Sequence, residues 1–204
     1  MIELSVQDSQ IVKAHALLSH IEKGAPRAIA AALNRTIEGV KTDATKMITT
    51  TYDIKAGDVR PIIKAHRASA STLLASARAS GGVIPLKKFR VLSSKPGTAL
   101  RVSVKKSGGK AIKGAFEATM KEVGFGKNRR AAEPGEEHVG IFRRKGKART
   151  PIKELYGPSV AQMMGEVGVI EYVSIGAADR FEKRLDHEIG RLLSKGRFCG
   201  SITG

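Results

Sequence analysis

The sequence is poor in cysteine and in aromatic residues. Its 204 residues include one cysteine, Cys199, three tyrosines, six phenylalanines and no tryptophan. A single cysteine excludes an intrachain disulfide framework and a metal cluster built from cysteines, and it fits a reducing compartment. Because aromatic residues are so few, the core has to be built from isoleucine, valine, leucine, alanine and methionine.

Long apolar runs and targeting signals are also missing. No run approaches the roughly 20 apolar residues that a membrane-spanning helix needs. The first residues, Met-Ile-Glu-Leu-Ser-Val, do not have the basic and then apolar layout of a signal peptide. We therefore expect a soluble protein of the cytoplasm that does not bind a membrane.

Motifs for catalysis and for metal or cofactor binding are not found either. The five histidines are scattered, and His15 and His20 are not spaced by the three or four residues that place two ligands on one face of a helix. The stretch Ser107–Ala111 lacks the full spacing of a phosphate-binding loop, and Gly157–Ala161 lacks the second glycine of a nucleophile elbow. We expect no enzymatic activity, no metal site and no cofactor.

Positive charge, in contrast, is abundant and unevenly distributed. The formal net charge is +17, and residues 86–153 hold 19 lysines and arginines against 5 acidic residues, a net charge of +14. Such a concentration is typical of a protein that meets an anion: nucleic acid, an acidic protein surface or an anionic membrane. A solvated surface that keeps the protein soluble is the alternative interpretation.

The stretch from His138 to Val160 combines this charge with a strand pattern. Val139, Ile141 and Phe142 begin a strand, and basic residues then crowd around Gly146, which predicts an exposed basic hairpin with apolar residues at both ends. Too few aromatic residues lie near the basic clusters for stacking on single-stranded bases. The expected residues of assembly or anion contact are Lys87, Lys88, Arg90, Lys127, Arg129, Arg130, Arg143, Arg144, Lys145, Lys147 and Arg149, and the expected structural turn residues are Pro151, Gly157, Pro158 and Ser159.

Hydrophobic periodicity predicts an α+β fold. Apolar residues recur every three or four positions over residues 8–24, 25–49 and 169–192, which predicts an N-terminal helical hairpin and a long C-terminal helix that Gly196 ends. A short helix is expected from Asp58 through Lys64 and another over residues 160–164. Strands are expected over residues 69–80, 84–91, 100–105, 112–120 and from His138 onward, with a turn over residues 107–110 and Phe116 buried. These strands would form one mostly antiparallel sheet of four to five strands.

The expected organisation is a single domain over residues 1–204. Residues 1–57 would form its helical N-terminal part, and residues 66–153 its basic, β-rich part, with a mobile loop near residues 124–137. Residues 158–196 would form its helical C-terminal part.

The order of several short motifs resembles a known family. These motifs are Ala31–Arg35, Ile84–Phe89, Gly114–Phe116, Val139–Ile152 and Leu155–Val160. Together they resemble the phage minor tail protein Z family, which includes tail-completion proteins of long-tailed bacteriophages and prophages. The resemblance covers most of the chain, from about Gly24 to Leu193. The segment Gly126–Glu137 departs from it, because it is longer and more charged than the usual turn of the family.

The resemblance implies a structural virion protein without catalytic residues. It would act in tail completion and head-tail joining, as part of a ring at the head-proximal end of the tail, with a hexamer matching the tail tube. The implied partners are other copies of itself, the tail terminator and tube, head connector proteins and passing DNA. The implied location is the virion tail, with assembly in the cytoplasm of the bacterial host. A non-specific nucleic-acid-binding protein that uses the basic residues 86–153 is the alternative.

Overall fold

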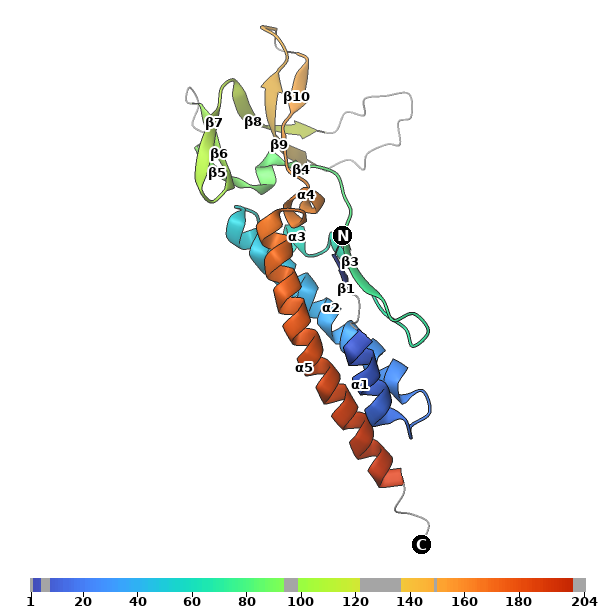
Figure 1. The fold of residues 1–204 in the computed structure, drawn as a ribbon. Helices are drawn as coiled ribbons and strands as arrows, with labels where there is room; N and C mark the ends of the chain where they lie inside the picture. The colour runs from blue at the N-terminus through green and yellow to red at the C-terminus, as the bar shows by residue number, and fades with distance from the viewer. Residues whose placement is uncertain (1, 5–7, 94–98, 122–136, 149, 200–204) are drawn as a thin grey trace. The chain divides into compact units, whose positions relative to one another are not determined.

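The computed structural model confirms the α+β class, with 48% of the chain in helices and 29% in strands (Figure 1). It describes residues 2–4, 8–93, 99–121, 137–148 and 150–199. The chain forms two compact units, the first from residues 1–48, 59–81 and 160–204 and the second from residues 49–58 and 82–159. Each unit is assembled from separate stretches of sequence, and the single-domain organisation expected above stays a prediction.

Helices dominate the first unit. They are α1 (Asp8–Leu18), α2 (Gly24–Thr51, whose last residues belong to the second unit), α4 (Val160–Met164) and α5 (Val167–Cys199). The apolar stripes predicted from the sequence form the buried faces of these helices. Burial of one face stabilises a helix that would be marginal in water by itself. On α2 the stripe includes Ile29, Leu33, Ile37 and Val40, and on α5 it includes Val173, Phe181, Leu185 and Ile189.

The long helix continues beyond its expected end. Gly196 was expected to stop it, but α5 extends to Cys199. A glycine inside a helix costs only about 1 kcal/mol relative to alanine, so it does not by itself end a helix.

A small antiparallel sheet completes the first unit. It contains β1 (Ile2–Leu4), β2 (Ile63–His66) and β3 (Ala75–Ala79) in the order β1–β3–β2. The helix expected from Asp58 through Lys64 is therefore wrong beyond Val59: α3 covers Ala56–Val59, and Ile63 is buried on β2 in register with Ala79. Pairing with a distant strand overrides the local helical signal there.

The strand expected over residues 69–80 is shorter than predicted for a local reason. The N–H of Ser69 donates to the Thr72 carbonyl at 3.0 Å, and the Ser69 hydroxyl accepts from the Thr72 N–H at 3.0 Å. The side chain of Asn34 on α2 binds both backbone groups of Ala68, at 2.9 and 2.7 Å. These bonds hold the chain in a turn, so that β3 begins only at Ala75.

Short strands make up most of the second unit. They are β4 (Ile84–Pro85), β5 (Arg90–Ser93), β6 (Leu100–Lys105), β7 (Gly108–Ile112), β8 (Ala115–Lys121), β9 (Glu137–Arg144), β10 (Ile152–Glu154) and β11 (Tyr156–Gly157), with the 3₁₀ helix η1 (Leu86–Lys88) after β4. Among the described residues they form the antiparallel sheets β5–β6–β7, β8–β9–β10 and β4–β11. The strands are thus divided among small sheets, where one sheet was expected.

Two turns lie at other positions than expected, and the second of them separates strands of different sheets. Lys106 and Ser107 alone make the first, so β7 already begins at Gly108, inside the expected turn. Gly114 makes the second with a φ of +74°, a conformation that glycine adopts without steric cost, and it separates β7 from β8 within the strand expected over residues 112–120. Phe116, expected to be buried, is half-buried on β8. The expected mobile loop, except for Glu137, lies outside the described residues.

Candidate interaction surface

The expected basic hairpin is formed by β9 and β10. The two strands are antiparallel, with Arg143 opposite Lys153 and Arg144 opposite Ile152. The Lys145 N–H donates to the carbonyl of Pro151 at 3.0 Å and closes the base of the tip. Pro151 follows a cis peptide bond. Arg143, Arg144 and the tip residues 145–148 are exposed, so the hairpin presents its cations to the surroundings.

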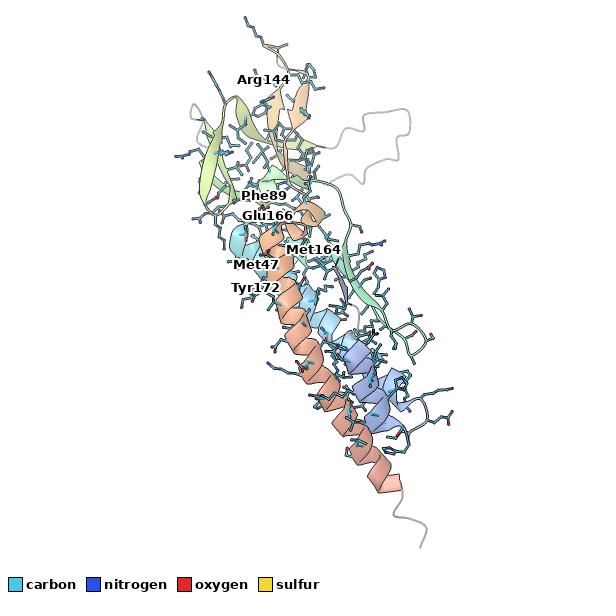
Figure 2. The ribbon with its side chains drawn as sticks, in the orientation of Figure 1. Met47, Phe89, Arg144, Met164, Glu166 and Tyr172 are labelled. Atoms are coloured by element: carbon cyan, nitrogen blue, oxygen red, sulfur yellow. The ribbon has the colours of Figure 1, made fainter. Side chains whose placement is uncertain are left out.

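Apolar contacts fix the hairpin on the unit that carries it. Ile141 and Phe142 are neighbours on β9, so they point to opposite faces, and both are buried, with exposed fractions of 0% and 6%. The Phe142 ring lies 6.4 Å from the ring of Phe116 on β8. The Arg144 guanidinium is 5.8 Å from the Phe116 ring centre, a cation–π distance, and Arg144 lies toward the far end of the hairpin (Figure 2). Arg144 is therefore held by the sheet, unlike the cations of the tip.

A hydrogen-bonded cluster joins the base of the hairpin to β11. Glu154 accepts a bond from the Tyr156 hydroxyl at 2.7 Å, and its other oxygen lies 2.9 Å from His138 Nε2. Bonding to Glu154, with a smaller effect of burial, raises the pKa of the Tyr156 phenol above its ordinary value. Gly140 leaves room for this carboxylate, because a Cβ at that position would lie 2.8 Å from Glu154 Oε1.

Two of the predicted contact residues are already paired within the second unit. Lys87 on η1 forms an ion pair with Glu117, and Lys88 forms one with Asp58 at 2.7 Å. Arg90 on β5 is exposed and has no ion-pair partner among the described residues. The predicted contact residues Lys127, Arg129, Arg130 and Arg149 lie outside the described residues.

The expected turn residues Gly157, Pro158 and Ser159 occupy different places in the fold. Gly157 pairs with Ile84 as the last residue of β11, and a Cβ there would lie 2.6 Å from the Phe89 ring. Pro158 and Ser159 lead into α4, which begins at Val160. Gly157 is thus needed for close approach of β11 to an aromatic ring, which sequence spacing alone does not indicate.

A second basic feature was not recognised as a site from the sequence. It is a groove of about 310 Å³ in the second unit, beside the last turn of α2. Four cations line it, and they come from three separate stretches of sequence. Its lining residues are Thr49, Tyr52, Asp53, Ile54, Lys55, Lys88, Phe89, Arg90 and Lys106. We call it the α2-end groove.

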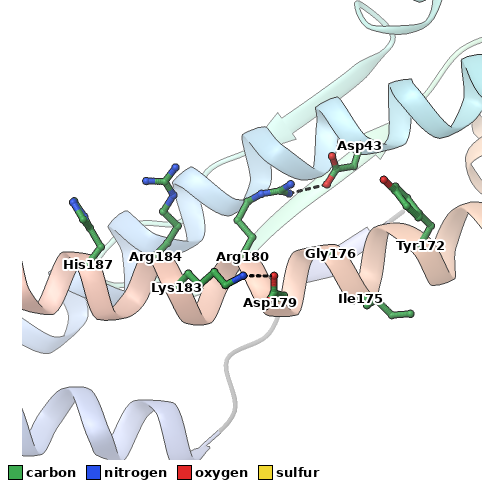
Figure 3. A pocket seen from close by; sticks show the side chains of 9 residues that line it. All are labelled: Asp43, Tyr172, Ile175, Gly176, Asp179, Arg180, Lys183, Arg184 and His187. Carbon is green, nitrogen blue, oxygen red and sulfur yellow. Dashed lines mark hydrogen bonds and ion pairs between the residues drawn. The ribbon is translucent and has the colours of Figure 1, made fainter.

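The first unit contains a larger groove, of about 670 Å³, between α2 and α5 (Figure 3). Arg180 on α5 reaches Asp43 on α2 at 2.8 Å, and Lys183 pairs with Asp179 at 2.8 Å. Gly39 makes the first pair possible, because a Cβ on Gly39 would lie 2.4 Å from Arg180 Nη1. Acidic and basic side chains pair along this groove, in contrast to the cation-rich groove of the second unit.

Two further features bear on the type of protein. Within the described residues, no group of three or more histidine, cysteine, aspartate or glutamate side chains is placed to hold a metal ion. None of the helices in the described part of the chain is long and apolar enough to cross a membrane. The outstanding feature is charge: the second unit holds 20 lysines and arginines against 8 acidic residues, net +12 of the total of +17.

Comparison with known proteins places the chain among the structural proteins of phage tails. The chain belongs to the family described as prophage minor tail protein Z (GPZ), whose model matches residues 11–195. The match contains all the motifs that carried the resemblance, and it identifies the chain as a component of the virion tail. No curated protein and no solved structure matches the chain.

Proposed function

We propose that this tail protein completes the tail at its head-proximal end and takes part in joining the tail to the head, as a subunit of a ring. The observation that carries the proposal is the β9–β10 hairpin, which presents exposed cations from a firmly packed base and lies within the residues that match the family. A ring subunit needs a rigid body for packing and projecting elements for contacts with the next layer. The hairpin is such an element.

The hairpin cations set the chemistry of the partner surface. Arg143, Lys145 and Lys147 are exposed and have no ion-pair partner among the described residues. They would bind an acidic surface on a neighbouring copy, on the tail terminator or tube, or on a head connector protein. Charge complementarity of this kind selects the partner and its orientation more than it adds affinity. A hexameric ring would match the tail tube, and the protein would act without catalysis.

The proposal is tested by removing the gene from the phage and examining the particles. Tails should form but fail to join heads, and the purified protein should sediment as a ring that binds isolated tails. Normal head-tail joining without the protein, or its absence from wild-type virions, would contradict the proposed place in assembly.

A charge-reversal variant tests the hairpin itself. Arg143→Glu, Lys145→Glu and Lys147→Glu should abolish binding to tails while thermal unfolding stays unchanged, because exposed substitutions rarely change stability by more than about 0.5 kcal/mol each. Arg144 is left in place because its stacking on Phe116 is structural.

The matched control reverses an equal number of exposed cations in the first unit: Arg27, Arg60 and Lys64. The control should retain tail binding. Equal loss in both variants would show that net charge, and not the hairpin, governs assembly.

A further inference from the structure

The α2-end groove is built by the chain segment that follows α2. The Asp53 N–H donates to the Val104 carbonyl at 3.0 Å, and the Lys106 N–H donates to the Thr51 carbonyl at 3.0 Å. Ile54 forms a β-bridge with Phe89 a short way along the same segment. The backbones that carry the groove's cations are therefore hydrogen-bonded to one another.

Among the described residues, carboxylates balance only part of the positive charge in this groove. Of its four cations only Lys88 has an ion pair, with Asp58, whereas Lys55, Arg90 and Lys106 have none among the described residues. Among the described lining residues Asp53 is the one with a carboxylate, which accepts a hydrogen bond from the Ser103 hydroxyl and offsets one of the four positive charges. Clustered cations in a concave surface focus positive potential there, which favours an anionic ligand.

The apolar lining narrows the class of ligand. The side chains of Tyr52, Ile54 and Phe89 line the groove but are only 4%, 7% and 3% exposed. They offer no aromatic face on which a single-stranded base could stack and no apolar pocket for the side chains of a peptide. The groove therefore offers a ligand the positive charges and N–H donors of its lysine and arginine side chains. These suit the phosphates of a nucleic-acid backbone.

We propose that the α2-end groove binds the phosphate backbone of double-stranded DNA without reading its sequence. Lys55, Arg90 and Lys106 provide the contacts, and Lys88 joins them when it exchanges Asp58 for a phosphate. The inference does not depend on the place of the protein in the tail. The residues that line the groove are separate in sequence from the tip of the β9–β10 hairpin, and DNA binding by the groove does not require that the protein form a ring.

The test is a titration of fluorescent 20-base-pair duplexes with the full-length protein at several salt concentrations. Each phosphate contact contributes about 0.9 to the slope of log affinity against log salt. The variant Lys55→Gln, Arg90→Gln, Lys106→Gln should therefore lower the slope by about 2 to 3 units, equally for two duplexes of different base composition. A control with glutamine at Arg27, Arg60 and Lys64 removes the same charge from the first unit and should change the slope by less than about one unit.

Several outcomes would overturn the proposal. The groove variant keeping the slope of the wild type would do so, as would a dependence of the affinity on base composition. Poly-glutamate that displaces the duplex at equal charge concentration would assign the groove to an acidic protein. Thermal unfolding of the same variants provides a further readout. If the groove variant loses stability but keeps its DNA affinity, the cations stabilise the partial negative charge at the C-terminal end of α2 and do not bind DNA.

Discussion

Gly157→Ala probes how tightly the second unit is built around Phe89. The Cβ of the new alanine would lie 2.6 Å from Phe89 Cε2 and 2.9 Å from Cζ, whereas carbon atoms in contact are about 3.5–4.0 Å apart. The ring cannot move aside easily, because Phe89 is 3% exposed and its backbone donates to Leu86 and bridges to Ile54.

The expected cost is that of overpacking a core, about 1–3 kcal/mol. Loss of the glycine's freedom in the unfolded chain returns at most about 1 kcal/mol, so the net effect is destabilising. Urea unfolding followed by circular dichroism measures the change. Because the chain has two units, the transition of the second unit has to be followed separately, for example by a fluorescent probe placed in it.

The matched control is Gly146→Ala at the hairpin tip, where no heavy atom lies within 4 Å of the added Cβ. This variant should stay within about 0.5 kcal/mol of the wild type. Phe89→Leu removes the clash, so Gly157→Ala should cost less in the Phe89→Leu background than alone, a coupling that a double-mutant cycle measures. Equal midpoints for the two alanine variants would refute the packing described for Gly157.

Three further predictions concern single contacts. Gly39→Ala places a Cβ against the Arg180 side chain and displaces its guanidinium from the ion pair, so it should destabilise the wild type despite a gain of about 1 kcal/mol in helix propensity. In an Arg180→Ala background, where the clashing atoms are gone, Gly39→Ala should be stabilising; equal effects in both backgrounds would exclude the clash. Because the pKa of Tyr156 is raised, its protonated phenol stabilises the fold below pH ~10, and this contribution is lost as pH rises through the folded-state pKa. Ionisation of Tyr156 can be followed by the absorbance of its phenolate, and Glu154→Gln should move this transition to lower pH. An unchanged transition would contradict the assigned cause. Asn34→Ala leaves two backbone groups of the loop before β3 without their side-chain partner and should cost about 1–3 kcal/mol in thermal unfolding; a neutral result would mean that the loop finds other partners.

Patterns that repeat along the chain were predicted well. The three long apolar stripes became α1, α2 and α5, and the alternation in Leu100–Lys105 became β6 with the same bounds. These elements are predictable because one buried face selects residues at a fixed period, whatever the partner is. The family was predicted from the order of its motifs, which can also be read from the sequence without knowledge of tertiary contacts.

Contacts between distant stretches were predicted poorly. The pairing of Ile63 with Ala79 turned an expected helix into β2, and Gly157, expected in a turn, became a strand residue against Phe89. A short segment has too little local preference to resist a favourable tertiary partner. The same limit applies to the expected single sheet, because which strands pair is decided by turns such as the one at Gly114.

By itself, the sequence determined the α+β class, the presence of α1, α2 and α5, the family and the concentration of positive charge in residues 86–153. The tertiary structure decided which cations are free to act. It paired Lys87 and Lys88 with carboxylates, stacked Arg144 on a ring, and left the hairpin tip exposed. It also brought Lys55 to the groove that Lys106 lines. The physical reason is that net charge is a sum over residues, whereas pairing and convergence depend on distances that only the folded chain sets.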